Sequence, residues 1–144
     1  MSRTPGASRR WQREPAVIAV CLAAALVMTW PLARDFTTRI CGDIGDPQSE
    51  LWSMRWMRDA LVALRNPFFT TRVFHPQGTT LVFNTFDIPS TLLVVPMWGW
   101  ASEVVIYNTA VLVAFALTAY GMACLARELT GDVLAGVLAG LLFA

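Results

Sequence analysis

The chain has 144 residues, of which 56% are hydrophobic and 15% are charged, and its mean hydropathy is +0.52. Soluble domains carry about 25% charged residues, so this composition excludes an ordinary soluble domain. A net charge of +1, with no basic block beyond the N-terminus, argues against nucleic acid binding. The composition therefore indicates an integral membrane protein.

The first 33 residues predict a tail and a membrane helix. Residues 1–14 carry four arginines against Glu14 alone, with Gly, Pro and Ser between them, which predicts a disordered basic tail in the cytoplasm. Residues 16–33 carry no charge, and the end of this segment reads Trp-Pro-Leu-Ala-Arg (30–34), which lacks a small-x-small cleavage site. We therefore expect an uncleaved first span, with residues 15–144 forming part of a multi-pass domain.

Residues 34–87 predict a long loop outside the cell, because long loops are translocated largely regardless of charge. Within it, Asp46-Pro47 predicts a helix start with Asp46 as the N-cap. Placed on a helix, residues 47–65 show a broad apolar arc, which includes Trp52 and Trp56, and an arginine-lined edge. This pattern predicts an interfacial helix with both tryptophan rings among the lipid headgroups and Glu50 pointing into the apolar arc.

The C-terminal third predicts three more apolar segments. Residues 88–102 are interrupted by prolines and predict a short or thin span, whereas residues 104–126 form the clearest span. Residues 133–144 open another helix with Gly136 and Gly140 at GxxxG spacing, which suits close helix packing. The whole pattern predicts an all-α, multi-pass helical bundle, here an N-terminal fragment whose partners include the remaining helices of a longer protein.

Three acidic residues, Asp43, Asp46 and Glu50, lie close together at the start of the interfacial helix. One interpretation is structural, because Asp caps helices and Glu offsets the helix dipole. The other is chemical, because carboxylates near a low-dielectric region have raised pKa values and suit proton abstraction or divalent cation binding. The residues alone leave both interpretations open.

Other polar residues have similar alternatives. Arg55, Arg58, Arg65 and Arg72 either bind a lipid phosphate or anchor the helix among headgroups. His75 is the one histidine; it suits acid–base work, although a histidine before proline in a turn is usually a surface residue.

Several motifs resemble a known family. The pattern Gly-Asp-Ile-Gly-Asp-Pro-x4-Trp-x3-Trp (42–56), after one apolar span, is similar to the start of GT-C membrane glycosyltransferases and of a bacterial branch of multi-pass proteins related to them. Asn-Pro-Phe-Phe-Thr (66–70), His-Pro-Gln-Gly-Thr (75–79), Tyr107-Asn108 and Leu-Ala-Arg-Glu-Leu-Thr-Gly (125–131) fit the same branch. The resemblance covers residues 16–144.

The resemblance implies a sugar transferase in a bacterial plasma membrane, with a polyprenyl-phosphate sugar as donor and the first loop outside. As a truncated fragment, the chain is expected to be inactive by itself. In the family an acidic residue of this loop is the base, often with a divalent metal such as Mg²⁺ or Mn²⁺. By position, Asp46 and then Asp43 are the expected catalytic residues and metal ligands, and Glu50, Arg55, Arg58 and His75 are expected to contact substrate. The family's paired acids are replaced here by two aspartates three positions apart, which leaves the choice between them open.

Two alternatives come from other functional classes. A part of a transporter or flippase would place ionisable residues inside its spans, and the predicted spans hold none. A non-catalytic membrane assembly protein would tolerate the loss of its acidic residues.

Overall fold

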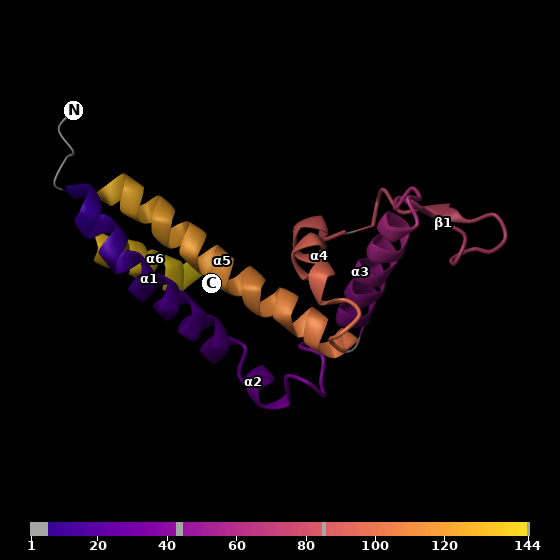
Figure 1. Cartoon of the computed structure of the whole chain (residues 1–144), viewed down its shortest axis with the longest axis horizontal. Coiled ribbons are helices and arrows are strands. Elements are labelled where there is room, and N and C mark those ends of the chain that lie inside the picture. Colours follow the sequence, from indigo (N-terminus) through magenta and orange to yellow (C-terminus); the bar gives the residue numbers. More distant parts are fainter. Residues whose placement is uncertain (1–5, 43–44, 85, 144) are drawn as a thin grey trace. The chain divides into compact units, whose positions relative to one another are not determined.

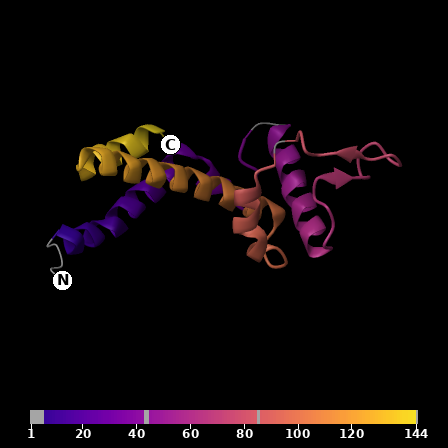
Figure 2. The same cartoon turned by 90° about the horizontal axis from the view of Figure 1, so that it is seen from above.

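The computed structural model describes residues 6–42, 45–84 and 86–143, and it gives side chains from residue 14 onward. In this part of the chain the protein is mostly helical, with six α-helices, one short 3₁₀ helix and a small two-stranded sheet. The chain divides into two compact units (Figures 1 and 2). The first unit contains the chain up to Asp35 and from Val111 onward, and the second runs from Phe36 to Ala110.

The first unit is built on helix α1, which spans Gly6–Met28. Its backbone is helical from Gly6, inside the segment expected to be a disordered tail, and it ends before the predicted limit of residue 33. The end has a local cause, because Pro31 disfavours helical geometry at the residue before it, and the short helix α2 (Leu32–Asp35) follows. Val17, Cys21 and Ala25 are buried at a spacing of four, so they form one packed stripe on α1.

Helices α5 (Glu103–Thr130) and α6 (Val133–Phe143) complete this unit as a hairpin. Figure 1 shows α6 alongside α5 and α1. Gly131, with a φ of 74°, ends α5 by donating its N–H to the Arg127 carbonyl at 2.8 Å. Asp132 then starts α6, because its carboxylate accepts the Leu134 N–H at 3.0 Å.

The two glycines of the GxxxG motif pack against α5 of the same chain. A Cβ atom on Gly136 would lie 2.6 Å from the Ala123 carbonyl oxygen, and one on Gly140 would lie 2.5 Å from that of Ala119. Small residues therefore face small residues across the hairpin. The close packing predicted for this motif is confirmed, and its partner is a helix of this chain.

One polar cluster joins α1 to α5 in this unit. Arg127 forms an ion pair with Glu14 at 2.7 Å, and Tyr120 donates a hydrogen bond to the same carboxylate at 3.1 Å. The Arg127 and Glu14 side chains are only 11% and 15% exposed. The pairing compensates two charges that would be costly to bury singly.

The second unit is built around helix α3, which spans Asp46–Val62. Strands β1 (Phe69–Thr70) and β2 (Thr79–Thr80) then pair antiparallel, with Phe69 opposite Thr80. Helix α4 (Ile88–Val94), the 3₁₀ helix η1 (Val95–Met97) and the first part of α5 complete the unit. The predicted helical architecture is confirmed for most of the described residues, and the short hairpin of β1 and β2 is a departure from all-α. The segment 88–102, predicted as a short or thin span, contains the short helices α4 and η1.

The predicted bounds of the interfacial helix, 47–65, are corrected to Asp46–Val62. Gly45, not Asp46, is the N-cap residue, and the Gln48 side chain accepts the Gly45 N–H at 2.6 Å. Gly45 has a φ of 123°, which residues with a side chain rarely adopt. Asp46 therefore lies in the first turn and does not cap the helix.

The apolar face of α3 packs inside the second unit. Met54 is buried with Val94, Ile106 and Ala110, and Trp56 is buried with Ala60 and Leu81. The Trp56 ring N–H donates to the Pro67 carbonyl at 2.8 Å, and the ring stacks on Trp52 with centroids 6.3 Å apart. The following loop therefore covers Trp56 inside this unit, and the placement of either ring among lipid headgroups stays a prediction.

Candidate functional site

Two groups of polar side chains in the second unit are candidates for function. The first, which we call the acidic edge, consists of Asp46, Glu50 and Asp87. The first turn of α3 supplies Asp46 and the next turn supplies Glu50. Asp87 is the N-cap of α4, where its carboxylate accepts the Ser90 N–H at 3.1 Å.

Glu50 is the perturbed member of the acidic edge. Burial raises the pKa of its carboxyl above the ordinary value, and the negative charges of Asp87 and Asp46 raise it further. Glu50 is half-buried, whereas Asp46 and Asp87 are exposed. A carboxylate with a raised pKa is a stronger proton acceptor than an ordinary one, so this arrangement suits a general base.

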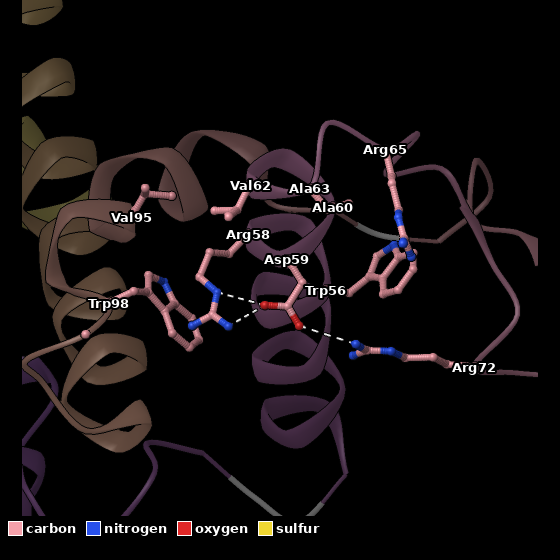
Figure 3. A pocket seen from close by; sticks show the side chains of 11 residues that line it. Trp56, Arg58, Asp59, Ala60, Val62, Ala63, Arg65, Arg72, Val95 and Trp98 are labelled. Carbon is pink, nitrogen blue, oxygen red and sulfur yellow. Dashed lines mark hydrogen bonds and ion pairs between the residues drawn. The ribbon is translucent and has the colours of Figure 1, made fainter.

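The second candidate, which we call the arginine pocket, is a cavity of about 550 Å³ around the C-terminal half of α3 (Figure 3). The lining residues that carry chemistry are Trp56, Arg58, Asp59, Arg65, Arg72 and Trp98. Arg58 and Glu50 are about 12 Å apart along the axis of α3, from the helical rise.

Asp59 links two of the pocket arginines. Its carboxylate pairs with Arg58, whose Nε donates at 2.9 Å, and with Arg72 at 3.5 Å. Figure 3 shows the carboxylate between the two guanidinium groups. The hydrogen bond from Arg58 holds the pKa of Asp59 below its ordinary range, so this carboxyl is charged at neutral pH.

Two tryptophan rings, Trp98 and Trp56, contact the same two arginines. The Arg58 guanidinium lies 4.4 Å from the centre of the Trp98 ring, and that of Arg72 lies 5.1 Å from the centre of the Trp56 ring. Both distances suit a cation–π interaction. The pocket is therefore electropositive with aromatic walls.

The structure brings some expected site residues together and separates others. Asp46 and Glu50 share the acidic edge, and Arg58 joins Arg65 and Arg72 in the pocket. Arg55 instead pairs with Glu103, and His75 is exposed in the loop between β1 and β2.

Asp43 lies outside the described residues, so its expected roles as base and metal ligand stay predictions. Among the residues that the structure does describe, no three His, Cys, Asp or Glu side chains are close enough together to hold a metal ion.

Sequence reasoning missed Asp87 and Trp98 as members of these sites. Asp87 precedes Ile-Pro-Ser, which is a recognisable helix start, but nothing in the pattern places it beside Glu50. Trp98 follows η1 and reaches Arg58 only through the packing of α4 on α3. Both therefore depend on tertiary contacts.

A scan against models of protein families and searches of curated proteins and solved structures found no match to this chain. The described residues define a mostly helical protein with one apolar helix, α5, long enough to cross a membrane.

Proposed function

We propose that this chain is an integral membrane protein with several membrane helices. The 28 residues of α5 extend about 42 Å, against about 30 Å for the hydrocarbon core of a bilayer. Only 22% of its most apolar stretch is buried inside the chain, unlike the core helix of a soluble protein. Many large side chains that are exposed in the first unit are also apolar, including Ile18, Leu22, Leu117, Leu125, Leu134 and Leu138.

We further infer that the second unit takes part in sugar transfer of the GT-C type, with a polyprenyl-phosphate sugar as donor. The supporting observation is the acidic edge, where Glu50 has a raised pKa beside Asp46. In this proposal one of these carboxylates accepts the proton of the acceptor hydroxyl. The hydroxyl oxygen bonds to the anomeric carbon as the donor phosphate leaves with the bonding electron pair.

The test uses a radiolabelled polyprenyl-phosphate hexose and isolated membranes that contain the longer protein, of which this chain is expected to be the N-terminal part. Glu50→Gln and Asp46→Asn should each be assayed for label transferred to the membrane acceptors. Loss of a general base lowers the rate by about 10²-fold or more. Asp132→Asn is the matched control, because Asn caps a helix about as well as Asp and this position lies in the first unit.

A stability measurement separates loss of chemistry from loss of folding. Because the folded pKa of Glu50 is raised, its charged form is disfavoured in the folded state. The wild type should lose stability as pH rises through that pKa, whereas Glu50→Gln should not. A Gln variant that is at least as stable at pH 8 yet inactive supports the base, and wild-type transfer by both variants contradicts it and favours a non-catalytic membrane protein.

A further inference from the structure

The arginine pocket has a surplus of positive charge that its own residues do not neutralise. Three guanidinium groups, from Arg58, Arg65 and Arg72, face one carboxylate, from Asp59, which leaves two net positive charges (three minus one). Within residues 6–42, 45–84 and 86–143, no ion pair or side-chain hydrogen bond involves Arg65. A dianionic group would balance this surplus, and guanidinium matches phosphate geometry through paired N–H donors.

The arginines are held in place before any ligand arrives. Asp59 and the two tryptophan rings fix Arg58 and Arg72, as Figure 3 shows. Such preorganisation reduces the side-chain entropy lost on binding.

Arg65 is positioned by the way α3 ends. The N–H of Arg65 donates to the Ala60 carbonyl at 2.8 Å, and that of Leu64 donates to the Leu61 carbonyl at 3.1 Å, which is a Schellman motif. Leu64 has a φ of 51°, a conformation that usually requires glycine. The helix therefore ends with a strained turn that directs the next residue, Arg65, to the pocket.

The remaining wall of the pocket is apolar. Val62 and Val95 line it beside the two indole rings, and Val62 is 78% exposed. A cavity with a cationic floor and an apolar edge suits an amphiphile better than a free anion, because the edge covers the first carbons of an attached chain.

From these contacts we propose that the arginine pocket binds the phosphate monoester of a lipid. Arg58, Arg65 and Arg72 contact the phosphate oxygens, Asp59 is a positioning residue, and Trp56 and Trp98 flank the first part of the chain. The ligand class includes the leaving group of the proposed transfer, and to that extent this inference deepens that proposal and rests on it. Binding itself needs no sugar and no catalytic base, so it can be tested separately.

The test is isothermal titration calorimetry of the purified chain in a neutral detergent. The probes are dioctanoyl phosphatidic acid, dioctanoyl glycerol, which lacks the phosphate, and inorganic phosphate. We expect phosphatidic acid to bind and dioctanoyl glycerol to give no heat. Inorganic phosphate should bind with a Kd at least about tenfold higher, because it lacks the apolar contacts of the acyl chains. If inorganic phosphate binds as tightly as phosphatidic acid, the proposal that the pocket selects the phosphate of a lipid is overturned.

Arg65→Gln locates the site, because this exposed arginine has no folding partner among the described residues. Loss of one charge-assisted pair should weaken phosphatidic acid binding by about 10-fold or more, and Arg65→Lys should recover part of it. Arg34→Gln removes the same charge from an exposed arginine of α2, in the first unit, and should change the affinity by less than about twofold. Equal effects of Arg65→Gln and Arg34→Gln would mean general attraction between charges and would overturn the pocket.

The two proposals fail separately. Loss of phosphatidic acid binding in Arg65→Gln, with Glu50→Gln still binding, is expected whether or not sugar is transferred. If sugar transfer persists without phosphatidic acid binding, the proposal for the acidic edge is kept and only the proposal for the arginine pocket is rejected.

Discussion

At the scale of single residues, Asn108 shows how one buried amide organises a loop. Its side-chain NH₂ donates to the carbonyls of Phe36 at 2.8 Å and Arg39 at 2.7 Å, and its oxygen accepts the N–H of Cys41 at 3.0 Å. The residue is completely buried. A helix–helix hydrogen bond is the usual role of Asn in an apolar helix, but here the amide holds the segment that leads into α3.

Replacing Asn108 with Ala should therefore destabilise the second unit. Three partly buried backbone groups lose their hydrogen-bond partner, and a cavity is left at the buried Asn108 position, which predicts a loss of about 2–4 kcal/mol in the free energy of unfolding. Denaturant unfolding in detergent, followed by circular dichroism, measures this change.

Asn84→Ala is the matched control, since exposed Asn84 makes one side-chain hydrogen bond, to Ser53 at 3.2 Å. It should cost less than about 1 kcal/mol. Equal losses for the two variants would show that the Asn108 contacts do not hold the loop.

At the scale of elements, the hairpin of α5 and α6 depends on the absence of side chains. Gly136 and Gly140 are buried against the backbone carbonyls of Ala123 and Ala119, at distances where a Cβ atom cannot fit. Backbone oxygens cannot move aside as flexible side chains do. The contact is therefore selective for glycine at both positions.

The double substitution Gly136→Ala and Gly140→Ala should push α6 away from α5. Overpacking of this kind costs about 1–3 kcal/mol, and it should appear as faster cleavage by protease at the Gly131 turn in detergent. Gly121→Ala is the control, because nothing lies within 4 Å of its added Cβ. There Ala should be neutral or stabilising by up to about 1 kcal/mol, from its helix propensity. Unchanged protection in the double variant would contradict the packing.

At the scale of the whole molecule, the proposed membrane topology sets the side on which each candidate site lies. The arginine cluster at residues 3–13 predicts a cytoplasmic N-terminus, and the α3 unit would then be outside the cell. Both the acidic edge and the arginine pocket belong to that unit. Their donors, acceptors and lipids would therefore be those of the outer leaflet.

Cysteine labelling tests this orientation in intact cells. Gln77→Cys is exposed in the β1–β2 loop and should react with an impermeant maleimide in a Cys41→Ala background. Gly78 is unsuitable for the label, because an added Cβ would lie 2.6 Å from the Thr70 carbonyl oxygen. Leu129→Cys, at the other end of α5, should react only after lysis. The reverse pattern would overturn the orientation.

The sequence by itself determined the features that depend on neighbours along the chain. Apolar runs and their breaks predicted α3, the long helix α5 and the start of α6, because helix formation and termination are local. The small-residue spacing of Gly136 and Gly140 likewise predicted close packing. The similarity to GT-C proteins stays a prediction.

The tertiary structure alone decided which side chains meet. Gly45, not Asp46, is the N-cap, and the Gln48 side chain accepts its N–H. Trp56 is buried because the following loop covers it. Asp87 reached Glu50, and Trp98 reached Arg58, across segments that are distant in sequence. Such contacts follow from how helices pack against one another, and the period of a sequence specifies a helix's faces but not which neighbour each face meets.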